Sequence, residues 1–195
     1  MTRPVLFIHS GGSQGPHEGS SDLVSYLRAG LSKDHVVLYP KMPDPEHPEY
    51  DLWKLTIQRE LSALEQEIIL VGHSLGGSVL LKYLSEEPCD KSIAGLFLVA
   101  PPYWGKKDWK VDEYVLLNDF DARLPEIPRI FLYHSRNDEV VPFRHLIHYA
   151  DKLPNSIGRA FENRGHLFST GLPELVDDIK NLSYEKVDSQ SVRRY

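Results

Sequence analysis

The sequence predicts an α/β fold, a doubly wound and mostly parallel sheet of about six strands flanked by helices. Short runs of β-branched and aliphatic residues alternate along the chain with longer segments of helical period. Several of the short runs are apolar on both faces, which is typical of parallel strands that helices cover on both sides. No internal repeat interrupts this alternation.

Six short apolar runs are predicted to be strands, in residues 5–8, 36–39, 68–71, 93–99, 129–134 and 158–162. Helices are predicted between them, because apolar residues keep helical spacing over residues 23–31, 53–64, 143–150 and 172–179. Further helices are expected to begin near Leu75 and to occupy residues 111–118. Ser20 and Ser21 are placed to cap the first helix, and Pro142 fits the first turn of a later one.

Length and charge restrict the kind of protein. A chain of 195 residues suits a single domain, expected over residues 1–182, with a polar tail at 183–195. The net charge of −6 argues against a nucleic-acid partner and against anionic membranes. No stretch approaches the ~20 apolar residues of a membrane helix, and no signal peptide is recognisable, so a cytoplasmic location is expected. The single cysteine, Cys89, excludes an intramolecular disulfide and a multi-cysteine zinc site.

The segment IILVGHSLGGSVLL places Ser74 between Gly72 and Gly76, where a buried strand runs into a helix. Such a turn is sharp and crowded, so side chains two residues before and after the serine would clash. The hydroxyl is then held at the carboxyl edge of the sheet, beside a helix N-terminus that favours negative charge. The pattern predicts a nucleophilic serine.

A serine hydroxyl needs a base, and the chain offers nine histidines. His166 is favoured, because it follows the last predicted strand and adjoins Gly165 in a loop that reaches the sheet edge. His73 is expected to project away from Ser74 and to have a structural role. His145 and His148 are interpreted as surface or hydrogen-bonded histidines rather than zinc ligands. The loop histidines without a recognisable setting are His17, His35 and His47.

The carboxylate that orients the base should come from another strand end. Asp138 fits, because it lies in the turn of RIFLYHSRNDEVVPF, directly after a predicted strand. Asp119 and Asp121 are competitors in a segment that resembles a helix end and linker, and Glu139 is a fallback. The chain order Ser74, Asp138, His166 is the order expected on this sheet.

The motifs GHSLGG, SRNDEVVP and NRGHLF, in this order on alternating strands and helices, resemble the α/β-hydrolase superfamily. The resemblance spans nearly the whole chain. It implies that Ser74 is the nucleophile, His166 the general base and then acid, and Asp138 the residue that orients His166.

Within the superfamily the chain looks most like the small, capless serine hydrolases and carboxylesterases, including the group named for a retinoblastoma-binding member. The Leu-x-Cys-x-Glu motif of retinoblastoma binding is absent, since Cys89 lies in EEPCDK. The chain begins at what would be the family's third strand, so this likeness also implies about six strands and no large cap.

Acyl transfer also needs donors for the developing oxyanion. One is expected to be the N–H of Leu75, and the second should come from the loop IHSGGSQG, where Gly11 is favoured over Gly12. The glycines of this loop do not form a dinucleotide fingerprint, because Ser10 stands where its first glycine would be.

These features predict a metal-independent serine hydrolase that cleaves a small-molecule carboxylic ester, thioester or amide without a cofactor. A non-catalytic binding protein of the same fold and an acyltransferase are the alternatives, and the oligomeric state stays open. Candidate substrate contacts are Met42 in a proline-rich loop, which is equally well a stiff connector, and Tyr103 and Trp104. These two aromatic residues cluster with Trp109 after the fourth predicted strand, and the cluster could instead be core or interface. A shallow, open cleft is expected.

Overall fold

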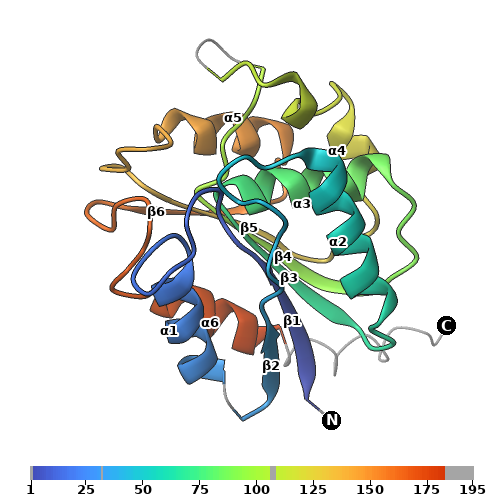
Figure 1. Ribbon diagram of the computed structural model, residues 1–195, viewed down its shortest axis with the longest axis horizontal. Coiled ribbons are helices and arrows are strands. Elements are labelled where there is room, and N and C mark those ends of the chain that lie inside the picture. The colour runs from blue at the N-terminus through green and yellow to red at the C-terminus, as the bar shows by residue number, and fades with distance from the viewer. Residues whose placement is uncertain (1, 32, 106–108, 183–195) are drawn as a thin grey trace, which may run out of the picture.

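The computed structural model describes residues 2–31, 33–105 and 109–182. Within these residues one sheet has six strands in the order β2-β1-β3-β4-β5-β6, and every neighbouring pair is parallel (Figure 1). The strands are β1 (Arg3–Ile8), β2 (His35–Leu38), β3 (Ile68–His73), β4 (Ile93–Val99), β5 (Ile130–Ser135) and β6 (Ile157–Phe161).

All six predicted strands are present, and their observed ends differ from the predicted ones by at most two residues; β4 spans Ile93–Val99 as predicted. The doubly wound α/β fold predicted from the sequence is therefore confirmed.

The helices are α1 (Ser21–Leu31), α2 (Tyr50–Ser62), α3 (Leu75–Glu86), the single 3₁₀ turn η1 (Asp112–Tyr114), α4 (Phe120–Arg123), α5 (Arg144–Lys152) and α6 (Pro173–Asn181). They form two layers around the sheet (Figure 1). Alternate strand residues face each layer, because successive side chains of a strand point to opposite sides of the sheet. Thus Leu6 and Ile8 pack with α2 and α3, whereas Val5 and Phe7 pack with α1 and α6.

One predicted helix is wrong. Residues 111–118 form only the turn η1, and the helix α4 that follows is four residues long. Tertiary contacts fix this segment, since the buried Tyr114 donates its hydroxyl to the carbonyl of Pro48 and Glu113 accepts the N–H of Tyr50. An isolated segment of eight residues is too short to hold a helix against such contacts.

Between β4 and β5 the described residues contain only η1 and α4, so they form no large cap over the sheet edge. None of the helices in the described ranges is long and apolar enough to cross a membrane. The predicted polar tail at residues 183–195 lies outside the described residues.

Candidate active site

Ser74 lies at the turn from β3 into α3, at the carboxyl edge of the sheet. Its backbone has φ 53° and ψ −123°, a left-handed conformation that costs a non-glycine residue about 1–3 kcal/mol. The turn is fixed by neighbouring strand and helix backbone: the Ser74 N–H donates to the Val99 carbonyl at 2.8 Å, and the Gly77 N–H donates to the Ser74 carbonyl at 2.9 Å. This strained turn holds the hydroxyl out at the N-terminus of α3.

The two glycines that flank Ser74 are required by the closeness of the surrounding backbone. A Cβ atom on Gly72 would lie 2.5 Å from the Cα of Gly77, and one on Gly76 would lie 2.5 Å from the carbonyl oxygen of His9. Real Cβ atoms do not approach backbone this closely. The steric reason predicted for the GHSLG pattern is therefore present in the fold.

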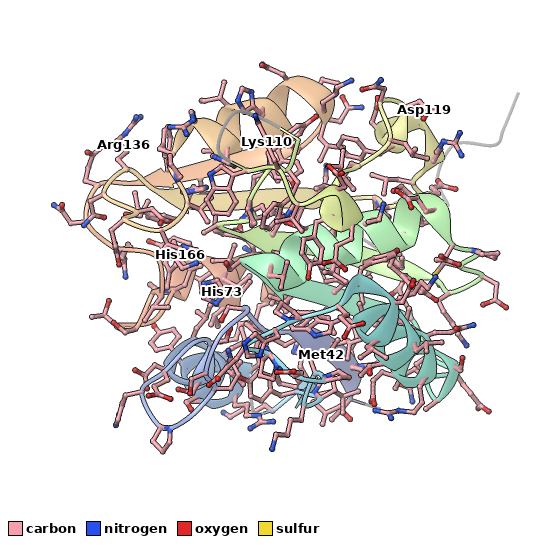
Figure 2. The ribbon with its side chains drawn as sticks, turned by 45° about the horizontal axis from the view of Figure 1, so that its top comes forward. Met42, His73, Lys110, Asp119, Arg136 and His166 are labelled. Carbon is pink, nitrogen blue, oxygen red and sulfur yellow. The ribbon has the colours of Figure 1, made fainter. Side chains whose placement is uncertain are left out.

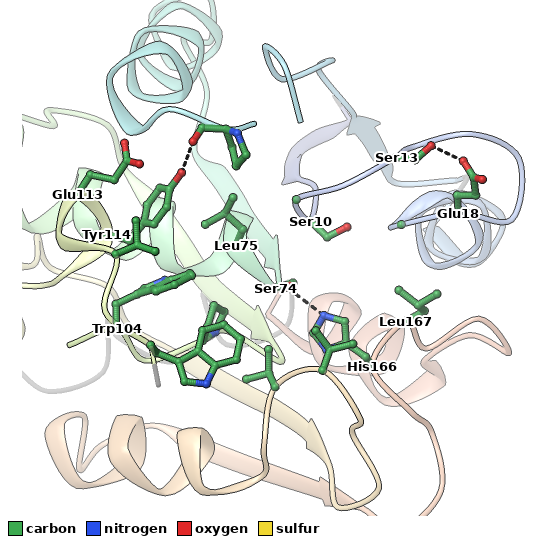
Figure 3. A pocket seen from close by; sticks show the side chains of 18 of the residues that line it. Ser10, Ser13, Glu18, Ser74, Leu75, Trp104, Glu113, Tyr114, His166 and Leu167 are labelled. Atoms are coloured by element: carbon green, nitrogen blue, oxygen red, sulfur yellow. Dashed lines mark hydrogen bonds between the residues drawn. The ribbon is translucent and has the colours of Figure 1, made fainter. Parts of the chain in front are cut away.

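His166 reaches the same edge from the loop after β6, and its Nε2 lies 2.9 Å from the Oγ of Ser74 (Figure 3). The loop is tied to the end of β5. The Arg164 N–H donates to the Ser135 hydroxyl at 2.9 Å, and the Gly165 N–H donates to the Asn137 side-chain carbonyl at 3.0 Å. Gly165 has φ 63°, a left-handed conformation that glycine adopts at little cost.

Asp138 follows β5 and accepts a hydrogen bond from the Nδ1 of His166 on its Oδ2 at 2.8 Å. Its other oxygen, Oδ1, accepts the N–H groups of Val140 at 2.9 Å and Val141 at 2.7 Å. Burial alone raises the pKa of Asp138, but hydrogen bonds from His134 and His166 outweigh it, and the pKa falls well below its ordinary value. A carboxylate held in this state fixes His166 with a lone pair on Nε2, facing Ser74.

The structure thus brings together the three side chains selected from the sequence. The competing carboxylates lie elsewhere: Asp119 pairs with Arg123 at 2.9 Å and lies well away from His166 (Figure 2). Asp121 lines a separate cavity beside α5.

Two residues expected to supply backbone donors, Leu75 and Gly11, line the same space. Leu75 is the first residue of α3, so its N–H has no partner within the helix. In the loop after β1, the Ser10 N–H donates to the Ser20 hydroxyl at 2.9 Å and the Gly12 N–H donates to the Pro45 carbonyl at 2.5 Å. The described residues include no acceptor for the N–H of Gly11, which lies in this loop beside the Leu75 side chain.

A cavity of about 750 Å³ opens at Ser74 and His166 (Figure 3). One wall is apolar and is formed by Leu75, Trp104, Trp109, Val111, Tyr114, Val140 and Val141. The other side carries polar residues of the loop after β1: Ser10, Ser13, His17 and Glu18. No large cap covers this cavity; residues 104, 109 and 111 of the segment after β4 and residues 140–141 contribute its walls.

Of the three residues proposed as substrate contacts, only Trp104 lines the cavity. Met42 is buried in the core, and its N–H donates to the Nε2 of His9. Tyr103 packs edge-on against Tyr149, so it belongs to the packing of α5 rather than to the cavity. The aromatic cluster after β4 is therefore divided between cavity wall and core, which composition alone could not distinguish.

Residues 23–171 match a family described as serine hydrolase. The chain belongs to this serine hydrolase family. It is similar to YdeN of Bacillus subtilis (strain 168), with 23% identity over 184 residues that cover 91% of this chain and 94% of that protein.

Several solved structures of other proteins have the same fold as this serine hydrolase. The ydeN gene product from B. subtilis matches with a TM-score of 0.78 and 21% identity, covering 93% of this chain and 99% of that one. The CarC enzyme, a serine hydrolase involved in carbazole degradation, matches with a TM-score of 0.70 and 16% identity, covering 93% and 90%. These likenesses confirm the α/β-hydrolase fold, whereas the narrower likeness to the retinoblastoma-binding group stays a prediction.

His145, one of the two α5 histidines of this serine hydrolase considered as zinc ligands, has a hydrogen-bond partner within the protein. His145 is buried on α5, and its Nδ1 accepts the N–H of Tyr103 at 2.7 Å. Burial and the charge of Arg144 lower the pKa of His145 to about 4, so it is neutral at ordinary pH. Within residues 2–31, 33–105 and 109–182, no group of three or more His, Cys, Asp or Glu side chains could hold a metal ion.

Two contacts at the site escaped the sequence reasoning. His134, at the end of β5, places its Nε2 3.3 Å from the Oδ2 of Asp138 and 2.8 Å from the Val141 carbonyl. Its position four residues before Asp138 on a strand end is the one signal that could have indicated it. Leu167 lines the cavity next to His166, and no pattern in the sequence marks it.

Proposed function

We propose that this serine hydrolase cleaves carboxylic esters of small molecules through an acyl-enzyme on Ser74. The observation that carries the proposal is the unbroken contact from the Ser74 hydroxyl through both nitrogens of His166 to the Asp138 carboxylate. A serine at neutral pH becomes a nucleophile only when such a base can take its proton.

In the first half of the reaction, the Oγ of Ser74 attacks the ester carbonyl carbon while the Nε2 of His166 takes the hydroxyl proton. The carbonyl π electrons move to oxygen and form a tetrahedral oxyanion. The N–H groups of Leu75 and Gly11 are the proposed donors to this oxyanion, and removal of one such donor typically slows acyl transfer by about 10²–10³-fold. Among the described residues the Gly11 N–H has no acceptor, whereas the Gly12 N–H is bonded to the Pro45 carbonyl. This difference favours Gly11 as the second donor.

Collapse of the tetrahedral intermediate breaks the bond to the leaving alcohol, which receives its proton from His166. Water then enters and attacks the acyl carbonyl carbon while His166 removes one of its protons. Collapse of the second tetrahedral intermediate breaks the bond to the Oγ of Ser74, which takes that proton from His166, and the acid is released. Asp138 stays ionised throughout and stabilises the imidazolium form of His166. Thioesters and amides would follow the same steps with a different leaving group.

A fluorophosphonate probe tests the proposal directly. The Ser74 Oγ should displace fluoride from phosphorus, and tryptic mass spectrometry should find the phosphonyl group on the peptide that contains Ser74. Ser74→Ala is the control and should not be labelled. If the wild-type protein takes no label and hydrolyses none of a panel of p-nitrophenyl esters, it is instead a binding protein with this fold. Transfer of most of the acyl group to an alcohol present at only millimolar concentration, in preference to water, would indicate an acyltransferase.

A further inference from the structure

A chain of buried polar groups runs behind Ser74 and His166 and takes no part in the proton transfers above. It consists of Ser10, Ser20 and His73, each of which is at most 3% exposed. Ser20 was predicted to cap α1, but its hydroxyl is directed to the Nδ1 of His73, 2.8 Å away. Polar side chains buried in this way must hydrogen-bond to one another because water cannot reach them, and this requirement restricts their arrangement.

The acceptor at one end fixes the direction of these hydrogen bonds. The backbone carbonyl of His166 can only accept, so the Nε2 of His73, at 3.0 Å, must carry the proton. A neutral His73 then has a lone pair on Nδ1, which accepts from the Ser20 hydroxyl. The oxygen of Ser20 in turn accepts the N–H of Ser10 at 2.9 Å. Burial and the charge of His166 lower the pKa of His73 to about 3, which keeps it in this neutral form.

The two ends of the chain lie in two different loops. Ser10 directly precedes Gly11, the proposed second oxyanion donor, and the Gln14 amide braces the same loop by donating to the carbonyls of Ser10 at 3.1 Å and Gly12 at 3.0 Å. The other end holds the backbone of His166, the proposed base. Figure 2 shows His73 next to His166, and their ring centroids are 5.3 Å apart.

We propose that Ser20 and His73 are positioning residues that hold the oxyanion loop and the loop of the general base in one fixed relation. The proposal rests on the proposed function. A break anywhere in the chain should displace both the Gly11 N–H and the His166 ring, while the cavity that binds the substrate is left in place.

Two breaking variants test this coupling, Ser20→Ala and His73→Leu, with Ser20→Thr as the variant that keeps the hydroxyl. Ser85→Ala is the matched control, because Ser85 is also buried but donates to Lys82 within α3. Hydrolysis of p-nitrophenyl butyrate gives kcat and KM. Inhibition by phenylboronic acid, which forms an anionic tetrahedral adduct with a nucleophilic serine, reports on the oxyanion site.

Each breaking variant should lower kcat by about 10–100-fold, with a parallel loss of boronate affinity and little change in KM. Ser20→Thr should recover part of the loss, and the double variant should be no worse than the poorer single one, because a chain is broken only once. Unchanged kcat in both folded single variants, a rise in KM alone, or additive losses would overturn the proposal.

A readout without turnover separates this proposal from the proposed function. The downfield proton resonance of the His166 Nδ1–H bonded to Asp138 should shift in Ser20→Ala and His73→Leu, but not in Ser85→Ala. Should the wild-type protein hydrolyse no ester, the proposed function fails, while a shifted resonance would still support the coupling of Ser20 to His166. An unmoved resonance in both variants would overturn that coupling.

Discussion

The Oδ2 of Asp138 lies 2.8 Å from the Nδ1 of His166, while its Oδ1 accepts two backbone N–H groups from the following turn. The carboxylate is therefore held from both sides, and its lowered pKa keeps it ionised at neutral pH. Its orientation does not depend on a substrate.

Asp138→Asn should preserve the volume of the side chain but remove the charge and the control over the His166 tautomer. We expect kcat to fall by up to about 10⁴-fold, measured with a p-nitrophenyl ester at pH 7.5. Asp119→Asn and Asp121→Asn, the carboxylates that competed with Asp138 in the sequence, are the controls and should retain activity. A crippled Asp119 or Asp121 variant beside an active Asp138→Asn would mean that the orienting acid has been misassigned.

Ser74→Ala should remove the proposed nucleophile and lower kcat by about 10⁴–10⁶-fold. The fold should not suffer, because alanine removes only the hydroxyl and relieves none of the backbone strain at φ 53°. Circular dichroism and the urea midpoint check the fold, and active-site titration checks the nucleophile. Turnover close to the wild-type rate in a contaminant-free preparation would exclude Ser74.

The sequence was sufficient to select Ser74, Asp138 and His166 because each lies at a strand end, and the ends of parallel strands meet at one edge. The buried strands were equally clear, since an apolar run such as 93–99 has few alternatives. Local pattern failed where tertiary contacts decide. Residues 111–118 were expected to form a helix because they lie between two strands. Tyr114 is instead bonded to Pro48 in the loop before α2, and Glu113 to Tyr50 at the start of α2.

Side-chain partners from distant segments were also beyond the sequence. Ser20 has the residue type and position of a helix cap, and only the fold brings His73, 53 residues away, within reach of its hydroxyl. Met42 and Tyr103 were selected by proximity to strand ends, but whether a side chain points into the cavity or into the core depends on the path of each loop. That path is not encoded in a short pattern.

Buried neutral histidines predict how stability depends on pH. In the folded protein the pKa values of His73 and His145 lie at about 3 and about 4, below the ordinary 6.5 that they regain on unfolding. Unfolding therefore takes up protons below pH 6.5, and stability falls by up to about 1.4 kcal/mol per pH unit for each proton taken up. The contribution is fully present above pH 6.5 and is lost as pH falls toward the folded values.

Urea unfolding at pH 7.0 and pH 5.0 measures this loss. His145→Gln should reduce the difference between the two pH values, because glutamine does not titrate but can still accept the N–H of Tyr103. His47→Gln is the control, since the His47 side chain is 83% exposed. An equal difference in wild type and His145→Gln would show that His145 is not held neutral in the fold.

The apolar wall of the cavity predicts which acyl groups are preferred. Trp104 packs against Trp109 and Tyr114 with ring centroids 5.0 Å apart in both pairs, forming a wall that acyl carbons can cover. Each buried methylene contributes ~0.8 kcal/mol, or about a fourfold gain in kcat/KM, for as long as it leaves water. A shallow cleft, as expected from the sequence, would end this gain within a few carbons, whereas a cavity of about 750 Å³ has room for more. We therefore expect kcat/KM for p-nitrophenyl esters to rise from acetate through hexanoate.

Trp104→Ala should reduce the ratio of kcat/KM for hexanoate to kcat/KM for acetate. Tyr103→Leu changes a neighbouring residue that lies outside the cavity and should leave this ratio unchanged. A ratio that is flat in the wild type, or that responds to Tyr103 rather than Trp104, would contradict this account of the wall.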